Sequence, residues 1–207
     1  MTEFSMMVVA VSSLAALLFG LRYAVAGPSA AKSMVKTVST AGLALAGVLA
    51  DAPPLIVAGL AFGALGDLAL SRPGERAFLA GMAAFALGHL FYAVEMINLS
   101  RGVAIAPAAA LLLLAASTEF WLAPHTGTVR WPVRLYVAVI TLMGLAALTL
   151  PLGPMQIGAA LFILSDLLLA LHLFVITEGA SHRRLALALW PAYWLGQALI
   201  LIGGLTG

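Results

Sequence analysis

The chain has 207 residues, of which 63% are hydrophobic and only 9% are charged, and its mean hydropathy is +1.11. Soluble domains carry about 25% charged residues, so this composition indicates a polytopic membrane protein and leaves no segment long enough for a soluble domain. The net charge of +2 does not indicate a nucleic-acid partner, because the basic residues stand singly between apolar runs. The absence of Cys excludes disulfides and thiolate-bound metals.

Eight apolar segments follow one another along the chain, most of them about as long as the roughly 20 residues that cross a bilayer. Turns that contain Pro, Gly or Arg separate them, the last being Gly179 to Ser181. We therefore predict an all-α, polytopic membrane protein that forms a single domain over 1–207. The predicted transmembrane helices are 4–26, 33–50, 54–71, 76–98, 103–123, 131–151, 154–177 and 184–205.

The basic residues are divided unevenly between the two sides of the predicted bundle. Nine of the ten flank the first, third, fifth and seventh connections, and only Arg101 lies on the opposite side. The positive-inside rule makes the side with nine basic residues cytoplasmic. Both termini then lie outside, and we expect the protein in the inner (plasma) membrane of a bacterium, with its site toward the cytoplasmic half.

Two of the apolar segments carry an aspartate, Asp67 and Asp166, in the shared pattern small-Asp-Leu-x-Leu. The offset of 166 − 67 = 99 residues is close to half the chain and suggests a parallel repeat of four helices, 1–100 and 101–207. An Asp within a span costs about 2.5–3.5 kcal/mol on insertion scales, so both are candidates for function. The other interpretation is that they tie helices together through hydrogen bonds.

Six more polar residues in the predicted spans are candidates for substrate binding: Lys36, His89, Tyr92, Tyr136, Tyr193 and Gln197. His89 and Tyr92 share one helix face at i and i+3, and Tyr193 and Gln197 share another at i and i+4. A Gln this deep in a membrane needs a hydrogen-bond partner. His89 has the alternative role of a packed, hydrogen-bonded core residue.

Three residues near the cytoplasmic interface have two interpretations each. Lys36 either extends its amine to the interface or provides a point charge for a lipid phosphate. Tyr136 is either an interfacial aromatic or part of the site. Glu119 either marks the rim of the polar pocket or pairs with Arg134.

Metal and serine chemistry are not indicated by the sequence. His89 is the only histidine that we place in the polar pocket, and no HxxxH or other ligand spacing occurs. There is no GxSxG motif, and adjacent Ser165 and Asp166 point about 100° apart on a helix. We expect no metal and no organic cofactor.

A set of short motifs occurs in order between about Lys36 and Ile200. They are Gly66-Asp67, Phe78 to Phe85, His89 to Tyr92, Tyr136 to Met143, Gly158 to Asp166 and Tyr193 to Gln197. The set resembles the YhhN-like lysoplasmalogenase family, whose members look like eight-span integral membrane proteins. The resemblance implies hydrolysis of the vinyl ether bond of lysoplasmalogen. The products would be a fatty aldehyde and glycerophosphoethanolamine or glycerophosphocholine.

The candidate residues suit that chemistry. A vinyl ether is hydrolysed by protonation of its β-carbon, which forms an oxocarbenium ion that water attacks. Like a glycosidase, such an enzyme needs one protonated carboxylic acid and one carboxylate. We predict Asp166 as the acid and Asp67 as the stabiliser and base, although the roles could be reversed. Lys36 would meet the phosphate, and the other binding candidates would orient the water and the glycerol oxygen.

A second functional class is a small proton-coupled membrane transporter. Intramembrane carboxylates at corresponding positions of two half-repeats also occur in carriers. A carrier needs polar groups leading to both faces, whereas an enzyme needs one pocket open to one side or leaflet. The candidates cluster in the cytoplasmic half, which favours an enzyme whose partners are a lysophospholipid substrate and the bilayer. The sequence leaves the oligomeric state open.

Overall fold

The computed structural model describes residues 3–102 and 105–206, and within these ranges it contains eight α-helices and no strand. The helices are α1 (Glu3–Leu18), α2 (Ala30–Leu49), α3 (Pro54–Leu70), α4 (Glu75–Asn98), α5 (Ile105–Trp121), α6 (Arg130–Ala147), α7 (Pro154–Ala170) and α8 (Gly179–Thr206). Single π-helical turns, Phe19–Tyr23 and Leu171–Val175, extend α1 and α7. The predicted all-α fold is confirmed. The start of the predicted span 103–123 lies outside the described residues.

Six of these helices, with the short turns that extend them, are long and apolar enough to cross a membrane: α1, α4, α5, α6, α7 and α8. Helices α1 and α7 count with their π-helical turns, and α5 and α6 count with the 3-10 turns Ala123–His125 and Gly127–Val129. Helix α3 is apolar but has only 17 residues, and α2, which carries Lys32 and Lys36, is not among the six. The chain is therefore an integral membrane protein. The half-repeat stays a prediction.

Two predicted helix ends differ from the structure. The turn predicted from Gly179 to Ser181 lies too late in the chain, because residues 176–178 make the connection and α8 already begins at Gly179, whose φ is +81°. Helix α6 ends at Ala147 rather than at 151. The amide of Gln156 donates to the carbonyls of Ala147 and Leu150, at 3.2 and 3.3 Å, and so satisfies acceptors that a longer helix would have bonded internally.

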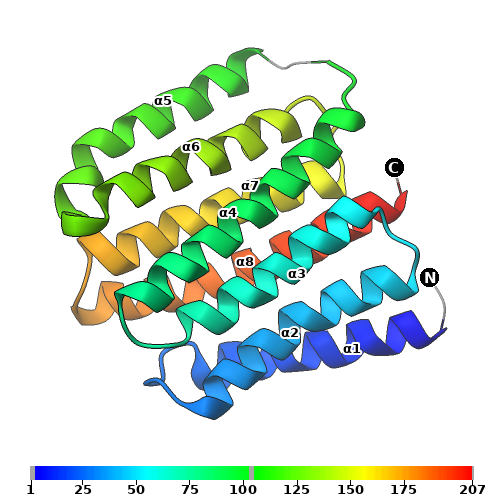
Figure 1. The fold of residues 1–207 in the computed structure, drawn as a ribbon, viewed down its shortest axis with the longest axis horizontal. Helices are drawn as coiled ribbons and strands as arrows, with labels where there is room; N and C mark the ends of the chain where they lie inside the picture. Colours follow the sequence, from blue (N-terminus) through cyan, green and yellow to red (C-terminus); the bar gives the residue numbers. More distant parts are fainter. Residues whose placement is uncertain (1–2, 103–104, 207) are drawn as a thin grey trace.

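The helices run alternately up and down, so that one end of the bundle carries every odd-numbered connection (Figure 1). We call this the basic end, because the connections α1–α2, α3–α4, α5–α6 and α7–α8 and their flanks hold nine of the ten Lys and Arg residues. Both termini lie at the other end (Figure 1). This is the distribution that the sequence predicted.

Helices α3, α4, α7 and α8 form the middle of the bundle, whereas α1 and α5 lie at its two edges (Figure 1). Glycines permit close packing in the middle, as small residues do between membrane helices. A Cβ atom on Gly158 of α7 would lie 2.7 Å from the carbonyl oxygen of Gly196 on α8. Likewise, Gly59 of α3 leaves the space that the ring of Tyr92 on α4 occupies. These close contacts determine the relative positions of the helices that carry the candidate residues.

Candidate active site

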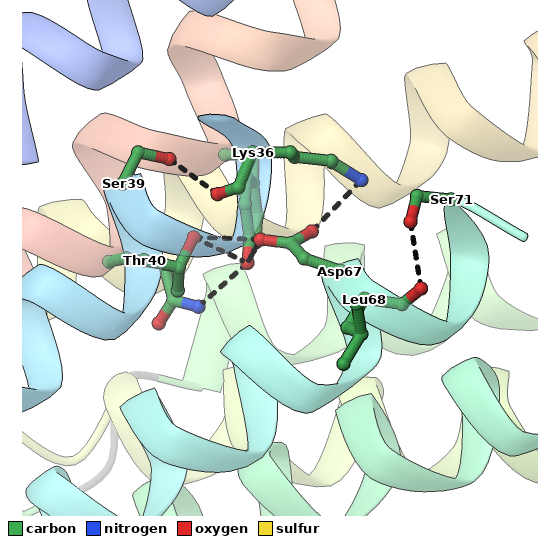
Figure 2. Close-up of polar contacts among 8 residues, drawn as sticks. Lys36, Ser39, Thr40, Asp67, Leu68 and Ser71 are labelled. Atoms are coloured by element: carbon green, nitrogen blue, oxygen red, sulfur yellow. Dashed lines mark hydrogen bonds and ion pairs between the residues drawn. The ribbon is translucent and has the colours of Figure 1, made fainter. Parts of the chain in front are cut away.

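The carboxyl group of Asp67 is completely buried and is surrounded by donors from two other helices (Figure 2). Its Oδ2 accepts hydrogen bonds from Thr40 Oγ1 at 2.7 Å and from the hydroxyl of Tyr193 at 2.8 Å. Lys36 Nζ forms an ion pair with Oδ1 at 2.9 Å. Lys36 and Thr40 reach Asp67 together because they stand four residues apart on α2. This environment stabilises an ionised carboxylate.

A chain of hydrogen bonds continues from Asp67 toward the middle of the bundle. Gln197 Nε2 donates to the hydroxyl oxygen of Tyr193 at 3.2 Å, and Tyr92 donates its hydroxyl proton to Gln197 Oε1. Tyr193 and Gln197, which were predicted to share a helix face, are thus hydrogen-bonded to each other, and the deep Gln has the partners it needs. We call Lys36, Thr40, Asp67, Tyr92, Tyr193 and Gln197 the Asp67 group.

Asp166 lies in a different setting, with Tyr136 and His89 as its neighbours. The hydroxyl of Tyr136 donates to Asp166 Oδ2 at 2.7 Å, and His89 Nε2 lies 3.6 Å from the same oxygen. His89 Nδ1 lies 2.6 Å from the backbone oxygen of Phe85. A carbonyl oxygen only accepts, so Nδ1 carries a proton and donates it. We call Tyr136, His89 and Asp166 the Asp166 group.

The bond to Phe85 determines what His89 presents to Asp166. In neutral His89, Nε2 bears a lone pair, and this buried atom has no hydrogen-bond partner among the described residues. Two acceptor atoms that face each other repel, so the arrangement is favourable when either His89 Nε2 or the carboxyl of Asp166 holds a proton. The geometry thus suits proton exchange between the two side chains once they close the 3.6 Å separation or share a water.

A cavity of about 110 Å³ opens beside Asp166, between α4, α5, α6 and α7. Its walls are almost entirely apolar and include Met82, Leu114 and Ile140. Asp166 is the only charged residue among the described residues that line it. The side chain of Asp166 is 13% exposed, whereas that of Asp67 is 0% exposed and does not line this cavity. A reacting molecule in the cavity would therefore meet Asp166.

Aromatic rings connect the two carboxylate groups. No hydrogen bond or ion pair joins Asp67 to Asp166 within 3–102 and 105–206. The ring of Phe162 contacts His89 at a centroid distance of 4.6 Å and Tyr193 at 5.3 Å. The carboxylates therefore belong to two neighbouring groups rather than to one hydrogen-bonded pair.

The structure brings all eight predicted site residues into these two groups. Thr40 was not predicted, although its position four residues after Lys36 places it on the same helix face, and neither was Phe162, whose apolar side chain gives no polar signal. Of the two roles considered for Glu119, the pairing with Arg134 is confirmed, with Arg134 Nε 2.9 Å from its carboxylate. The described residues contain no cluster of three His, Cys, Asp or Glu side chains placed to hold a metal ion.

The chain is similar in sequence to one protein family and to several named proteins. The sequence model of the YhhN family matches residues 31–204. Proteins named lysoplasmalogenase from Mycobacterium bovis and Mycobacterium tuberculosis are each 29% identical over 162 residues, which cover 73% of this chain and 60% of theirs. Lysoplasmalogenase TMEM86A of Bos taurus is 30% identical over 165 residues, 71% of this chain and 63% of its own. The chain thus spans about three-fifths of these relatives. No solved structure matches it.

Proposed function

The chain belongs to the YhhN family, and from this membership we propose that it is a membrane-embedded hydrolase of the vinyl ether bond of lysoplasmalogen. The products are a fatty aldehyde and glycerophosphoethanolamine or glycerophosphocholine. The observation that carries the proposal is Asp166, a carboxyl group at the wall of an apolar cavity with Tyr136 and His89 beside it. The names of the bacterial and bovine relatives support the same activity.

In the first step Asp166 acts as a general acid. Its carboxyl proton passes to the β-carbon of the vinyl ether, and the electron pair of the double bond forms the new C–H bond. The α-carbon and the ether oxygen then share the positive charge of an oxocarbenium ion. The carboxylate left on Asp166 lies next to that charge in a water-poor cavity, where it stabilises the ion strongly. The hydroxyl of Tyr136 holds the carboxyl group in place.

In the second step the Asp166 carboxylate acts as the base. Water adds to the α-carbon and returns one proton to Asp166, which regenerates the acid and leaves a hemiacetal. The hemiacetal then passes its hydroxyl proton to the glycerol oxygen as the carbon–oxygen bond to glycerol breaks, and the aldehyde forms. We propose that His89 Nε2 carries this proton between the two oxygens, because Nδ1 is already committed to Phe85. The sum consumes one water molecule and leaves Asp166 unchanged.

Asp67 has a supporting role in this scheme. It is fully buried and is held by Lys36, Thr40 and Tyr193, so it acts without touching the substrate. We propose that it positions Tyr193, whose ring packs on Phe162 and thereby supports His89. The negative charge of Asp67, largely offset by Lys36, contributes less to the oxocarbenium ion than the nearby Asp166 carboxylate.

The transport alternative receives less support. A carrier needs polar groups along a path to both faces, whereas the cavity at Asp166 has no second charged residue on its described walls. We further propose that the basic end faces the cytoplasm, as the positive-inside rule requires, with both termini outside. The cavity runs from about the level of Leu111 and Ile140 to that of Trp121 and Phe174, in the half of the bundle nearest the basic end.

The test uses the purified protein in detergent with lysoplasmalogen and with the matching ester lysophospholipid. We expect fatty aldehyde from the vinyl ether and no fatty acid from the ester. Asp166→Asn should lower the rate of aldehyde release by about 10²- to 10⁴-fold, as loss of a general acid does, without changing the melting temperature. Glu119→Gln is the matched control, because Glu119 is a solvent-exposed carboxylate that does not line the cavity. A folded Asp166→Asn variant that releases aldehyde at the parental rate would remove Asp166 from the mechanism.

A further inference from the structure

A second cavity lies at the basic end, between the start of α2 and the end of α3, and no part of the proposed mechanism uses it. Its volume is about 710 Å³, and it shares no lining residue with the cavity at Asp166. The polar residues of its wall are Ser29, Ser33, Thr37, Ser71 and Arg72. We call this cavity the α2–α3 groove.

Arg72 gives the α2–α3 groove its charge. The side chain is exposed, and its guanidinium makes no ion pair or hydrogen bond with any other described residue. No acidic residue is among those that line the groove. An unpaired guanidinium presents five N–H donors in a planar fork that matches the oxygens of a phosphate. The groove therefore favours an anion.

Thr37 adds a second indication of a ligand. Its Oγ1 is shielded from solvent and has no hydrogen-bond partner in the part of the chain that the structure describes. A shielded hydroxyl without a partner is unfavourable, and a rotation of the Thr37 side chain about its Cα–Cβ bond would let the hydroxyl donate to an acceptor oxygen bound in the groove that Thr37 lines. The groove also contains the first turn of the 20-residue helix α2, which Ser29 caps by accepting from the backbone N–H of Lys32. The free N–H groups and positive dipole of such a helix start attract the same anion.

The outer wall of the α2–α3 groove is apolar. Met34 and Val38 line it and are 64% and 45% exposed. Leu45 continues the same face of α2 toward the middle of the bundle, and it is also exposed. In a bilayer this face lies against lipid chains. The groove thus joins an anion-binding wall at the interface to an apolar strip that runs into the membrane.

From these features we propose that the α2–α3 groove binds the phosphodiester group of a membrane glycerophospholipid, whose hydrocarbon chain follows α2 along Met34, Val38 and Leu45. Arg72 and Thr37 bind the phosphate oxygens. The ligand can come from two sources, a two-chain phospholipid of the bilayer or a single-chain lysophospholipid. The proposal concerns binding at a separate site, so a test of binding there does not depend on whether the protein is a hydrolase.

The experiment measures lipid binding to the full chain in detergent by non-denaturing mass spectrometry, in the Asp166→Asn background so that turnover does not interfere. The probes are phosphatidylglycerol, lysophosphatidylethanolamine and inorganic phosphate. We expect bound lipid in the parent and about tenfold weaker binding in Arg72→Gln, because hydrogen bonds to charged groups are the strong ones. Thr37→Val should weaken binding without lowering the melting temperature of the lipid-free protein. Arg76→Gln is the matched control, because Arg76 is an exposed arginine in the first turn of α4 and does not line the groove.

Each outcome either supports or overturns the proposed site, or identifies which lipid is the ligand. Binding of both lipids that depends on Arg72 supports a resident bilayer lipid, and binding of the single-chain lipid alone supports a lysophospholipid. Equal binding by the parent and Arg72→Gln would overturn the site, as would an equal loss in Arg76→Gln. Binding of inorganic phosphate with no retention of either lipid would show a simple anion site and overturn the lipid proposal.

Discussion

Replacement of Lys36 by methionine tests what the buried ion pair with Asp67 contributes to folding. Asp67 is 0% exposed and keeps its two hydroxyl donors in the variant, but it loses the only positive charge within 4 Å among the described residues. Removing one partner of a buried ion pair costs about 3–5 kcal/mol, because the other charge is left uncompensated. Lys36 is itself 19% exposed, which places the expected cost near the lower value, about 3 kcal/mol.

The assay is thermal unfolding of the purified protein in detergent. In chains of this size each kcal/mol shifts the melting temperature by about 2–4 °C, so Lys36→Met should melt about 6–12 °C below the parent. The double variant Lys36→Met/Asp67→Asn should recover most of the loss, because the buried charge is gone. Arg134→Met breaks an ion pair of part-exposed side chains and should melt close to the parent.

Two results would refute this reasoning. If Lys36→Met melts like Arg134→Met, the buried ion pair contributes no more than a surface pair. If the double variant is as unstable as Lys36→Met, the loss comes from the packing of the lysine stem and not from an unpaired carboxylate.

Three further changes test the site and the packing around it. Tyr136→Phe removes the hydroxyl that orients Asp166 and should slow aldehyde release about tenfold, measured with the protein saturated with substrate; an unchanged rate would argue against that orienting role. Leu114→Trp fills the cavity from α5 and should abolish turnover with little change in melting temperature, whereas full activity would place the substrate elsewhere. Gly158→Ala puts a methyl group 2.7 Å from the carbonyl oxygen of Gly196 and should cost about 1–3 kcal/mol of unfolding free energy; a melting curve like the parent's would contradict this.

The sequence predicted the helices well and singled out the polar residues that the structure gathers into two groups, because both depend on local physical properties. Apolar runs of about 20 residues mark the helices, and the cost of a charge in lipid singles out Asp67 and Asp166. Helical spacing also predicted that Tyr193 and Gln197 share a helix face, where the structure shows them hydrogen-bonded, and it would have predicted Thr40 as a neighbour of Lys36.

The arrangement of the two carboxylates could not be predicted, because it depends on which helix faces meet. Helix α7 packs tightly along α8, and the ring of Phe162 contacts both His89 and Tyr193. Asp67 instead faces α2 and α8, where Lys36 and Tyr193 bind it. An internal pattern such as small-Asp-Leu-x-Leu gives the depth of a residue but not its partner.

Helix α5 differs from its neighbours in having no buried side chain over 106–121, and it packs mainly against α6. Few contacts would be lost if it moved away, so its separation from the bundle should need far less free energy than global unfolding. Amide protons of α5 should consequently exchange with deuterium faster than those of α4 or α8. Since α5 forms one wall of the cavity at Asp166, the same small opening would admit a lipid sideways from the bilayer, and the rest of the protein would keep its fold while the substrate enters.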